Sequence, residues 1–233
     1  MRSFGSSFRG QRRGRMARFV RWTLLLIFGF YAFCSLALIG LRWFAPLVTG
    51  VQIQRRIESF FEKGDYQSVQ IFIPLERIPL DLQHAVIAAE DGRFYEHNGI
   101  DWLELEKVFE EAETRGRLRG GSTISQQLVK NLFLTTHRWP VRKVLEVTLV
   151  PIEELVLPKD RILELYLNYI EWGPGIWGVE AAARRHYGIG ASQLNRDQSA
   201  RLAACIPDPR RRRPSQMDTY SEIILERMRG RGW

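Results

Sequence analysis

Residues 120–131 read GGSTISQQLVKN, a glycine pair followed by a helix-start signal. Thr123 can cap the helix, with the glutamine three residues on as its reciprocal partner. The free N–H groups and the positive end of the helix dipole then lie beside the glycine turn, which is an anion-binding arrangement. Gln127, Lys130 and Asn131 share one face by their spacing. The stretch therefore predicts a helix with a packed face and a polar face that can hold a phosphate. A solvated polar face is the alternative for such a helix taken alone.

Two further motifs combine carboxylates with cations. Upstream, residues 90–99 read EDGRFYEHNG. Downstream, Arg142 and Glu146 lie one helical turn apart, with Lys143 beside the arginine. We expect these two motifs and the helix between them to flank one cleft.

These residues resemble the peptidoglycan glycosyltransferase domain of class A penicillin-binding proteins and of the monofunctional biosynthetic peptidoglycan transglycosylases. The resemblance covers about residues 70–210. With no penicillin-binding domain after it, the chain resembles the monofunctional branch. The matching motifs, in the family's order and spacing, are Glu90, Asp91, Phe94, His97 and Gly99; residues 120–131; Arg142, Lys143 and Glu146; residues 159–168; and Gly175, Gly178, Ala181 and Ala182. The resemblance implies a mainly α, lysozyme-like bilobal glycosyltransferase domain with a smaller lobe near the membrane.

The resemblance also implies an activity, the polymerisation of lipid II into glycan strands. Such a transfer requires a base for the attacking hydroxyl and cations for the departing diphosphate. Glu90 would deprotonate the 4-hydroxyl of the acceptor's N-acetylglucosamine, and Glu146 would orient or stabilise the donor. Attack inverts the α-linked diphosphate to a β-1,4 linkage and releases undecaprenyl diphosphate. The implied substrate-binding residues are the phosphate ligands Lys130, Arg142 and Lys143 and the donor-site contacts Ser122, Gln127 and Asn131.

Other motif residues are expected to support the site. Asp91 is expected to fix its loop by pairing with an arginine. Phe94 and His97 are expected to pack and to form hydrogen bonds, and Tyr166 to hold the helix of the fourth motif in place.

The fifth motif combines glycines with tryptophans. Gly175 and Gly178 predict tight turns or a close helix approach. Trp172 and Trp177 can line a sugar groove or pack in the core, and the sequence leaves both readings open.

The composition limits cofactors and partners. The reaction requires no cofactor, although a divalent cation, Mg or Mn, is compatible with Glu146. The scattered histidines give no metal-ligand spacing, and Cys34 and Cys205 are expected to be packed free thiols. Without the seven arginines before residue 22 the formal net charge falls from +8 to +1, so nucleic acid is a poor partner. The expected partners are lipid II, the nascent glycan strand, the membrane and other cell-wall synthesis or division proteins.

Hydropathy and charge predict a membrane-tethered chain. Residues 22–41 carry no charge and are enough to span a bilayer core as a helix. The arginine-rich segment before them places the N-terminus in the cytoplasm, and the catalytic domain outside the cytoplasmic (inner) membrane, in the periplasm of a cell with two membranes. A cleaved signal peptide is the competing reading, but no small-x-small site follows the apolar run. The expected organisation is a basic cytoplasmic tail (1–21), a transmembrane anchor (22–41), a connector (42–69), the glycosyltransferase domain (70–214) and a C-terminal helix (215–233).

Apolar spacing and cap residues predict the helices of the domain. The predicted ranges are Leu80–Glu90, Asp101–Glu113, Thr123–Leu134, Val141–Leu157, Lys159–Asn168, Val179–Tyr187 and Arg196–Cys205, with a last helix started by Ser215 and Asp218. Pro151 should kink its helix or remove a hydrogen bond.

Three other segments have two readings each. Residues 115–121 can close over a substrate or simply connect two helices. Residues 210–213 are a solvated linker or a membrane-surface contact. Leu132 to Leu134 and Trp139 can insert into the membrane interface or pack in the small lobe.

Two other functional classes stay open. A lytic transglycosylase or lysozyme would share the fold, but it has less use for cations at the reacting carbon. A catalytically silent scaffold would lack a key group, and Glu90, Lys130, Arg142 and Glu146 are all present. The sequence departs from the family at residues 187–190, which read YGIG where Phe-Gly-Lys often stands, so a basic contact there is in doubt.

Overall fold

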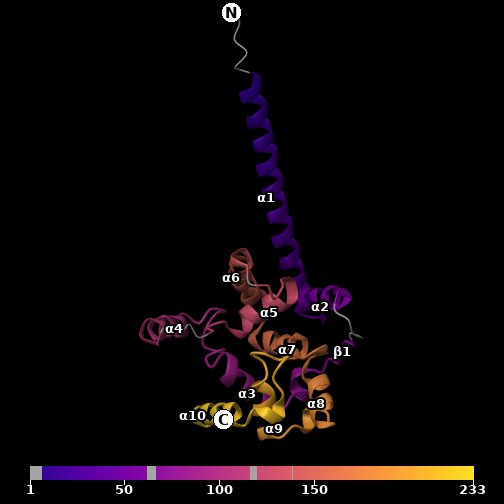
Figure 1. Ribbon diagram of the computed structural model, residues 1–233, viewed down its shortest axis with the longest axis vertical. Coiled ribbons are helices and arrows are strands. Elements are labelled where there is room, and N and C mark those ends of the chain that lie inside the picture. The colour runs from indigo at the N-terminus through magenta and orange to yellow at the C-terminus, as the bar shows by residue number, and fades with distance from the viewer. Residues whose placement is uncertain (1–6, 62–66, 116–119, 138) are drawn as a thin grey trace, which may run out of the picture.

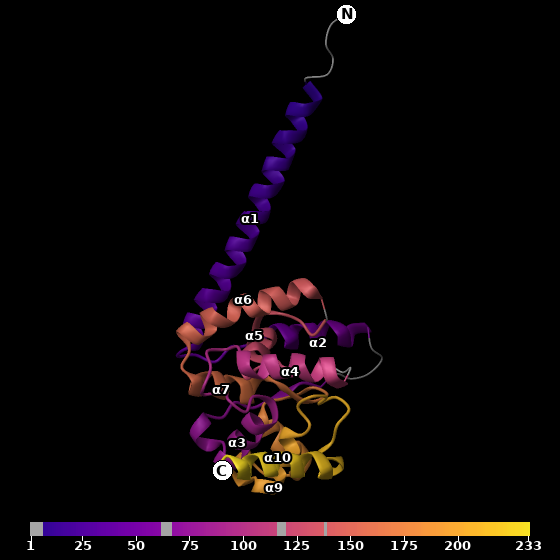
Figure 2. The ribbon, with the colours of Figure 1, turned by 90° about the vertical axis from the view of Figure 1, so that its left-hand side faces the viewer.

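One long helix stands out from a helical domain. The structure, a computed structural model, describes residues 7–61, 67–115, 120–137 and 139–233. Helix α1 (Ser7–Leu41) projects from one end of the domain, as Figures 1 and 2 show. Its stretch from Arg15 to Leu41 contains an 18-residue window with a mean hydropathy of 2.4 and is long and apolar enough to cross a membrane. The predicted anchor is therefore the domain-proximal part of a longer continuous helix.

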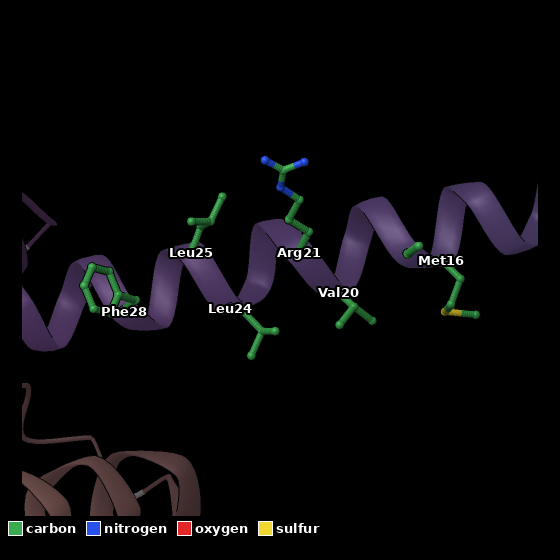
Figure 3. A pocket seen from close by; sticks show the side chains of 7 residues that line it. Met16, Val20, Arg21, Leu24, Leu25 and Phe28 are labelled. Atoms are coloured by element: carbon green, nitrogen blue, oxygen red, sulfur yellow. The ribbon is translucent and has the colours of Figure 1, made fainter.

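The outer part of α1 exposes apolar side chains. Figure 3 shows Met16, Val20, Leu24, Leu25 and Phe28 projecting from the helix with no other element packed on them. Apolar area left outside a core is unfavourable in water. A lipid environment removes that cost.

The inner end of α1 belongs to the core of the domain. Cys34 and Leu38 are fully buried, and α1 packs against α6 (Pro140–Val156). The hydroxyls of Tyr31 and Thr148 lie 2.5 Å apart, which joins the two helices by a hydrogen bond. The end of the anchor is therefore held at several points along α6.

Helices dominate the rest of the domain, with one small sheet. The remaining α-helices are α2 (Gly50–Phe61), α3 (Leu80–Glu90), α4 (Trp102–Arg115), α5 (Ile124–Phe133), α7 (Lys159–Tyr169), α8 (Val179–Tyr187), α9 (Arg196–Ala203) and α10 (Asp218–Gly230). Single 3-10 turns lie at Leu75–Arg77, Ala191–Gln193 and Pro214–Gln216. The strands β1 (Val69–Gln70), β2 (Glu171–Gly173) and β3 (Ile176–Trp177) form a sheet in the order β1-β3-β2, in which β1 pairs with β3 in parallel and β2 with β3 antiparallel. The mainly α prediction is confirmed.

Two groups of helices lie on opposite sides of α3. Helices α5, α6 and α7 lie between α3 and the end of α1, and α9 and α10 pack against α3 on the far side (Figures 1 and 2). One apolar core runs through both groups. Its members include Leu82 of α3, Leu128 of α5, Leu165 of α7, Leu202 of α9 and Ile224 of α10. Helix α10 is thus packed into the core, not appended to it.

Most helix boundaries follow the local signals. Helices α3 and α8 have the predicted bounds, and the capping box of Thr123 and Gln126 is present at the start of α5. Two ends differ. Helix α9 ends at Ala203, two residues before the predicted Cys205, and α10 begins at Asp218 because Pro214–Gln216 forms a 3-10 turn. Helix α6 continues through Pro151.

The fifth motif is a tight turn beneath α8. Gly178 has a φ of 79°, and a Cβ built there would lie 2.6 Å from the carbonyl oxygen of Asn168. The predicted close approach is confirmed. Trp172 and Trp177 are buried, so the reading that they line a sugar groove is wrong.

Apolar side chains also gather on the outer side of α6. Leu132 and Leu134 are buried, so the reading that this part inserts into a membrane interface is wrong. Trp139, in contrast, is 71% exposed. We call the exposed residues Trp139, Val141, Val144 and Leu155 the α6 apolar stripe. It lies on the element nearest the projecting part of α1 (Figure 2).

Candidate active site

Glu90 is the last residue of α3 and lines a cleft. The side-chain nitrogen Nε2 of Gln127, on α5, donates a hydrogen bond of 2.7 Å to Glu90 Oε2. On its other side, Gln127 Oε1 accepts a hydrogen bond of 3.0 Å from the hydroxyl of Tyr166, which is fully buried on α7. Three elements distant in sequence therefore fix the orientation of one carboxylate.

Burial and hydrogen bonding act in opposite directions on Glu90. Burial raises the pKa of its carboxyl group, while the bond from Gln127 and the charges of Lys130 and Arg212 lower it, leaving the pKa above its ordinary value. A raised pKa brings a carboxylate nearer to the working pH, where a general base is most effective. Burial also raises the pKa of Tyr166, so its phenol keeps the proton that it donates to Gln127.

A cluster of cations lies on the α5–α6 side of Glu90. Arg142 Nη1 lies 2.6 Å and Lys143 Nζ 2.5 Å from the two carboxylate oxygens of Glu146, which is 2% exposed. Lys143 Nζ also donates to Ser122 Oγ at 3.2 Å. The third cation, Lys130, has no carboxylate within hydrogen-bond distance among the described residues.

Lys130 is the cation best placed to serve a ligand. Burial lowers the pKa of its amine, and the charges of Arg142 and Lys143 lower it further, against the attraction of Glu146 and Glu90. Glu146 pairs with two of the three cations, but its single negative charge leaves the cluster with a net positive charge. Such a cluster can stabilise a departing diphosphate.

A second carboxylate, Asp91, ties the loop of the first motif to α5. Asp91 Oδ1 lies 2.8 Å from His97 Nε2, and Asp91 Oδ2 accepts a hydrogen bond of 3.0 Å from the backbone N–H of Ile124. The partners are therefore a histidine and the first N–H of a helix, and the expected arginine pairs elsewhere: Arg93 bonds to Asp101. A carboxylate at a helix start is favoured by the free N–H groups and by the helix dipole.

Asp91, His97 and Asp101 also have the residue types of a metal site. One ligand atom from each lies within 4.8 Å of the others. Both oxygens of Asp101 bond to Arg93, however, and both oxygens of Asp91 already have partners. A metal ion here would have to displace the guanidinium of Arg93. These side chains therefore hold the loop in place and do not favour a metal.

The carboxylate of Glu146 is also poorly suited to bind Mg or Mn. Its two oxygens are taken by Arg142 and Lys143, whose charges repel a metal ion. The site residues therefore supply positive charge through side chains.

The cleft that contains Glu90 extends away from the cation cluster. Its lining includes Ser122 and Gln127 on the α5 side and Tyr220 and Arg227 of α10, with Arg231 just after that helix and Arg212 from the segment before it. Gly120 and Gly121 line it as well, whereas residues 116–119 of the expected closing loop lie outside the described residues. The wall formed by α10 was not foreseen as part of the site.

The structure brings most of the expected residues together. Asn131 lies 6% exposed, with its side-chain amide bonded to the carbonyl of Gln127 on its own helix. Phe94 is fully buried beneath Lys159, whose Nζ lies 4.5 Å from the ring centre. Arg212 was not assigned to the site from sequence, and Tyr166 was expected only to hold the helix of the fourth motif in place. No local spacing links them to Glu90, because their contacts depend on the tertiary fold.

Comparisons with known proteins show which proteins this chain is similar to. The family model described as Transglycosylase matches residues 55–229. A protein of Ectopseudomonas mendocina named biosynthetic peptidoglycan transglycosylase is 44% identical over 201 residues, which cover 86% of this chain and 83% of that protein. A protein of the same name from Bordetella avium is 48% identical over 167 residues, covering 68% and 70%. Another from Dechloromonas aromatica is 41% identical over 222 residues, covering 91% and 96%.

Proposed function

This chain belongs to the transglycosylase family, and from that premise we propose that it polymerises lipid II with Glu90 as the general base. The coarser activity follows from the family and from the names of the relatives: the chain is a peptidoglycan glycosyltransferase that polymerises glycan strands. The observation that carries the assignment of the base is the hydrogen-bonded, partly desolvated Glu90 at the boundary between a cleft and a cation cluster.

In the proposed reaction Glu90 takes the proton of the acceptor's 4-hydroxyl. The oxygen attacks the anomeric carbon of the donor, which is the growing strand, from the face opposite its diphosphate. A bond forms between that oxygen and the carbon, the bond from the carbon to the diphosphate oxygen breaks, and the diphosphate leaves with the electron pair. The configuration inverts from α to β, and undecaprenyl diphosphate is released.

The cations act on the departing group. Lys130 is not neutralised by a directly bonded carboxylate among the described residues, so its charge is available to the diphosphate. Arg142 and Lys143 share Glu146 and are held by it in fixed positions. Ser122, bonded to Lys143, links this group to the cleft of Glu90. Preorganised charge of this kind stabilises the transition state without reorganisation during the reaction.

Polymerisation of fluorescently labelled lipid II by the detergent-solubilised full chain tests the proposal. We expect a ladder of products that a muramidase digests. Glu90→Gln keeps the size of the side chain and should lower the rate about 10²- to 10⁴-fold, the usual contribution of a general base. Glu76→Gln, the same change at an exposed site on the 3-10 turn before α3, should leave it unchanged. A Glu90→Gln protein as active as Glu76→Gln would rule out Glu90 as the base.

The placement in the cell is also part of the proposal. Arginines precede the apolar stretch of α1, which favours a cytoplasmic N-terminus and a single crossing of the inner membrane. The catalytic domain then lies on the periplasmic or outer side, with the α6 apolar stripe facing the lipid that carries the substrate. Other cell-wall synthesis or division proteins are the expected protein partners there.

A further inference from the structure

The far wall of the cleft carries cations that the proposed mechanism does not use. Among the lining residues, this wall consists of Pro207, Arg212, Tyr220, Arg227, Gly230 and Arg231. It contains three arginines and no carboxylate. The acidic residues of α10 lie outside the lining.

Two of the three arginines are not neutralised by a carboxylate. Arg231 lies 4.0 Å from Glu96. Neither Arg212 nor Arg227 has a carboxylate within 4.0 Å among the described residues. Arg212 donates to the carbonyl of Ala204 at 2.8 Å, and Arg227 to that of Ala88 at 3.2 Å. Each guanidinium therefore keeps N–H donors for another acceptor.

Both guanidinium groups are positioned near the reacting end of α3. Ala88, the acceptor for Arg227, lies two residues before Glu90, and the charge of Arg212 acts on Glu90 directly. The Arg212 guanidinium also lies over the ring of Tyr220, 5.4 Å from its centre, which restricts its orientation. An arginine held in this way loses little freedom when it binds an anion.

These cations and the α5–α6 cluster come from elements on opposite sides of α3. Lys130, Arg142 and Lys143 come from α5 and α6, whereas Arg212 and Arg227 come from the α9–α10 side of α3 (Figures 1 and 2). None of the three α5–α6 cations lines this cleft. One anionic group cannot account for both sets if the first holds the departing diphosphate.

We propose that Arg212 and Arg227 form a second anion-binding subsite, which holds an anionic group of the acceptor while Glu90 takes the proton of the acceptor's 4-hydroxyl. This inference rests on the proposed function, because it assigns the reacting hydroxyl to Glu90. The ligand chemistry is a carboxylate or phosphate group. Its two sources in the acceptor are the carboxylates of the peptide stem and the diphosphate of the lipid carrier. Arginine suits both because its planar guanidinium bonds to paired oxygens.

Direct binding measurements test the subsite without requiring turnover. In the full-length Glu90→Gln protein, we would measure the Kd of fluorescent lipid II by anisotropy, with Arg227→Gln, Arg212→Gln and Arg227→Lys added singly. Arg229→Gln is the matched control, since Arg229 is exposed on the same helix and does not line the cleft. Removal of either cleft arginine should raise Kd about three- to tenfold, the range for a charge-assisted hydrogen bond at a part-exposed site. Arg227→Lys should recover part of the loss.

Two altered ligands separate the sources of the anion. If the peptide carboxylates bind, lipid II with an amidated stem should show no difference between Arg227→Gln and Arg229→Gln. If the carrier diphosphate binds, the difference should persist with that ligand and vanish with a disaccharide-peptide that lacks the diphosphate. Either result supports the subsite.

A different set of results would overturn it. The inference fails if Arg227→Gln binds lipid II as tightly as Arg229→Gln, whether or not Arg212→Gln folds. Polymerisation by the chain without these substitutions is assayed in parallel. Polymer without a binding difference refutes the subsite alone, whereas no polymer and no binding refute the proposed function.

Discussion

Tyr166→Phe should impair catalysis although Tyr166 has no access to substrate. The substitution deletes the hydroxyl that donates to Gln127 Oε1 at 3.0 Å. That bond keeps the nitrogen of the Gln127 amide, rather than its oxygen, directed at Glu90. Without it the amide can turn over and present an oxygen to the carboxylate, which is repulsive. The effect on the reaction is transmitted entirely through Gln127.

The magnitude follows from one lost hydrogen bond. A neutral hydrogen bond contributes about 1 kcal/mol net, so its loss weakens the preference for the working orientation about fivefold and lowers kcat by at most about fivefold. The pH dependence should also change. The bond from Gln127 lowers the pKa of Glu90, so weakening it raises that pKa further. The base form of Glu90 is then lost at a higher pH, and the acid limb of the rate profile moves upward.

Tyr169→Phe provides the matched control. Tyr169 lies on the same helix, is nearly as buried, and donates to the carbonyl of Pro46 at 2.7 Å, away from Glu90. Both variants lose one phenol hydroxyl from a buried tyrosine and should lose similar stability, about 1–3 kcal/mol, because each leaves a part-buried acceptor without its partner. Initial polymerisation rates across pH, with thermal unfolding of both proteins, separate the two effects. An unchanged kcat and acid limb in Tyr166→Phe, or an equal shift in Tyr169→Phe, would refute the reasoning.

Three further substitutions test other parts of the structure. Gly178→Ala should destabilise the fold by about 3 kcal/mol or more in denaturant titration, because the new Cβ meets a carbonyl oxygen at 2.6 Å in a glycine-only region of backbone. Gly188→Ala, also at positive φ but with open space around it, should cost only about 1 kcal/mol, and equal losses would contradict this. Burial and neighbouring cations lower the pKa of Lys130, so the rate should fall as this amine loses its proton; Lys130→Arg should therefore move the alkaline limb to higher pH, and an unmoved limb would exclude Lys130 as its source. In a protein that begins at residue 31, without the outer part of α1 but with its packed end, Trp139→Ser should weaken binding to liposomes about tenfold, whereas Trp102→Ser, at a similarly exposed site on α4, should not. Identical binding would exclude the α6 apolar stripe as a membrane contact.

Local sequence signals were sufficient where neighbouring residues decide the structure. Helix α3 has the predicted bounds, and the Thr123 capping box needs only residues within one turn. The Gly178 turn was likewise readable, because glycine is required where the backbone of Asn168 comes close. Family resemblance added the grouping of Glu90 with the cation cluster, which spacing alone cannot give.

Signals failed where the outcome depends on the partner of a side chain. The apolar run from Leu132 to Leu134 fits a core and a membrane interface equally well by sequence, and burial decides for the core. Asp91 was expected to pair with an arginine but bonds to His97 and a helix start, since the fold brings α5 beside it. Arg212 was read as part of a charged linker because nothing local links residue 212 to residue 90.

The packing of Leu38 and Cys34 into the domain has a mechanical consequence for an enzyme that polymerises glycan strands. If a flexible linker joined the membrane helix to the catalytic domain, the domain could rotate freely relative to the helix. Here the final turns of α1 pack against α6, so the helix and the catalytic domain move as one rigid unit. With that helix in a bilayer, the mouth of the cleft keeps a fixed height above the membrane surface. Each strand would leave at that height, and a pull on the strand would be transmitted through the helix to the surrounding lipid.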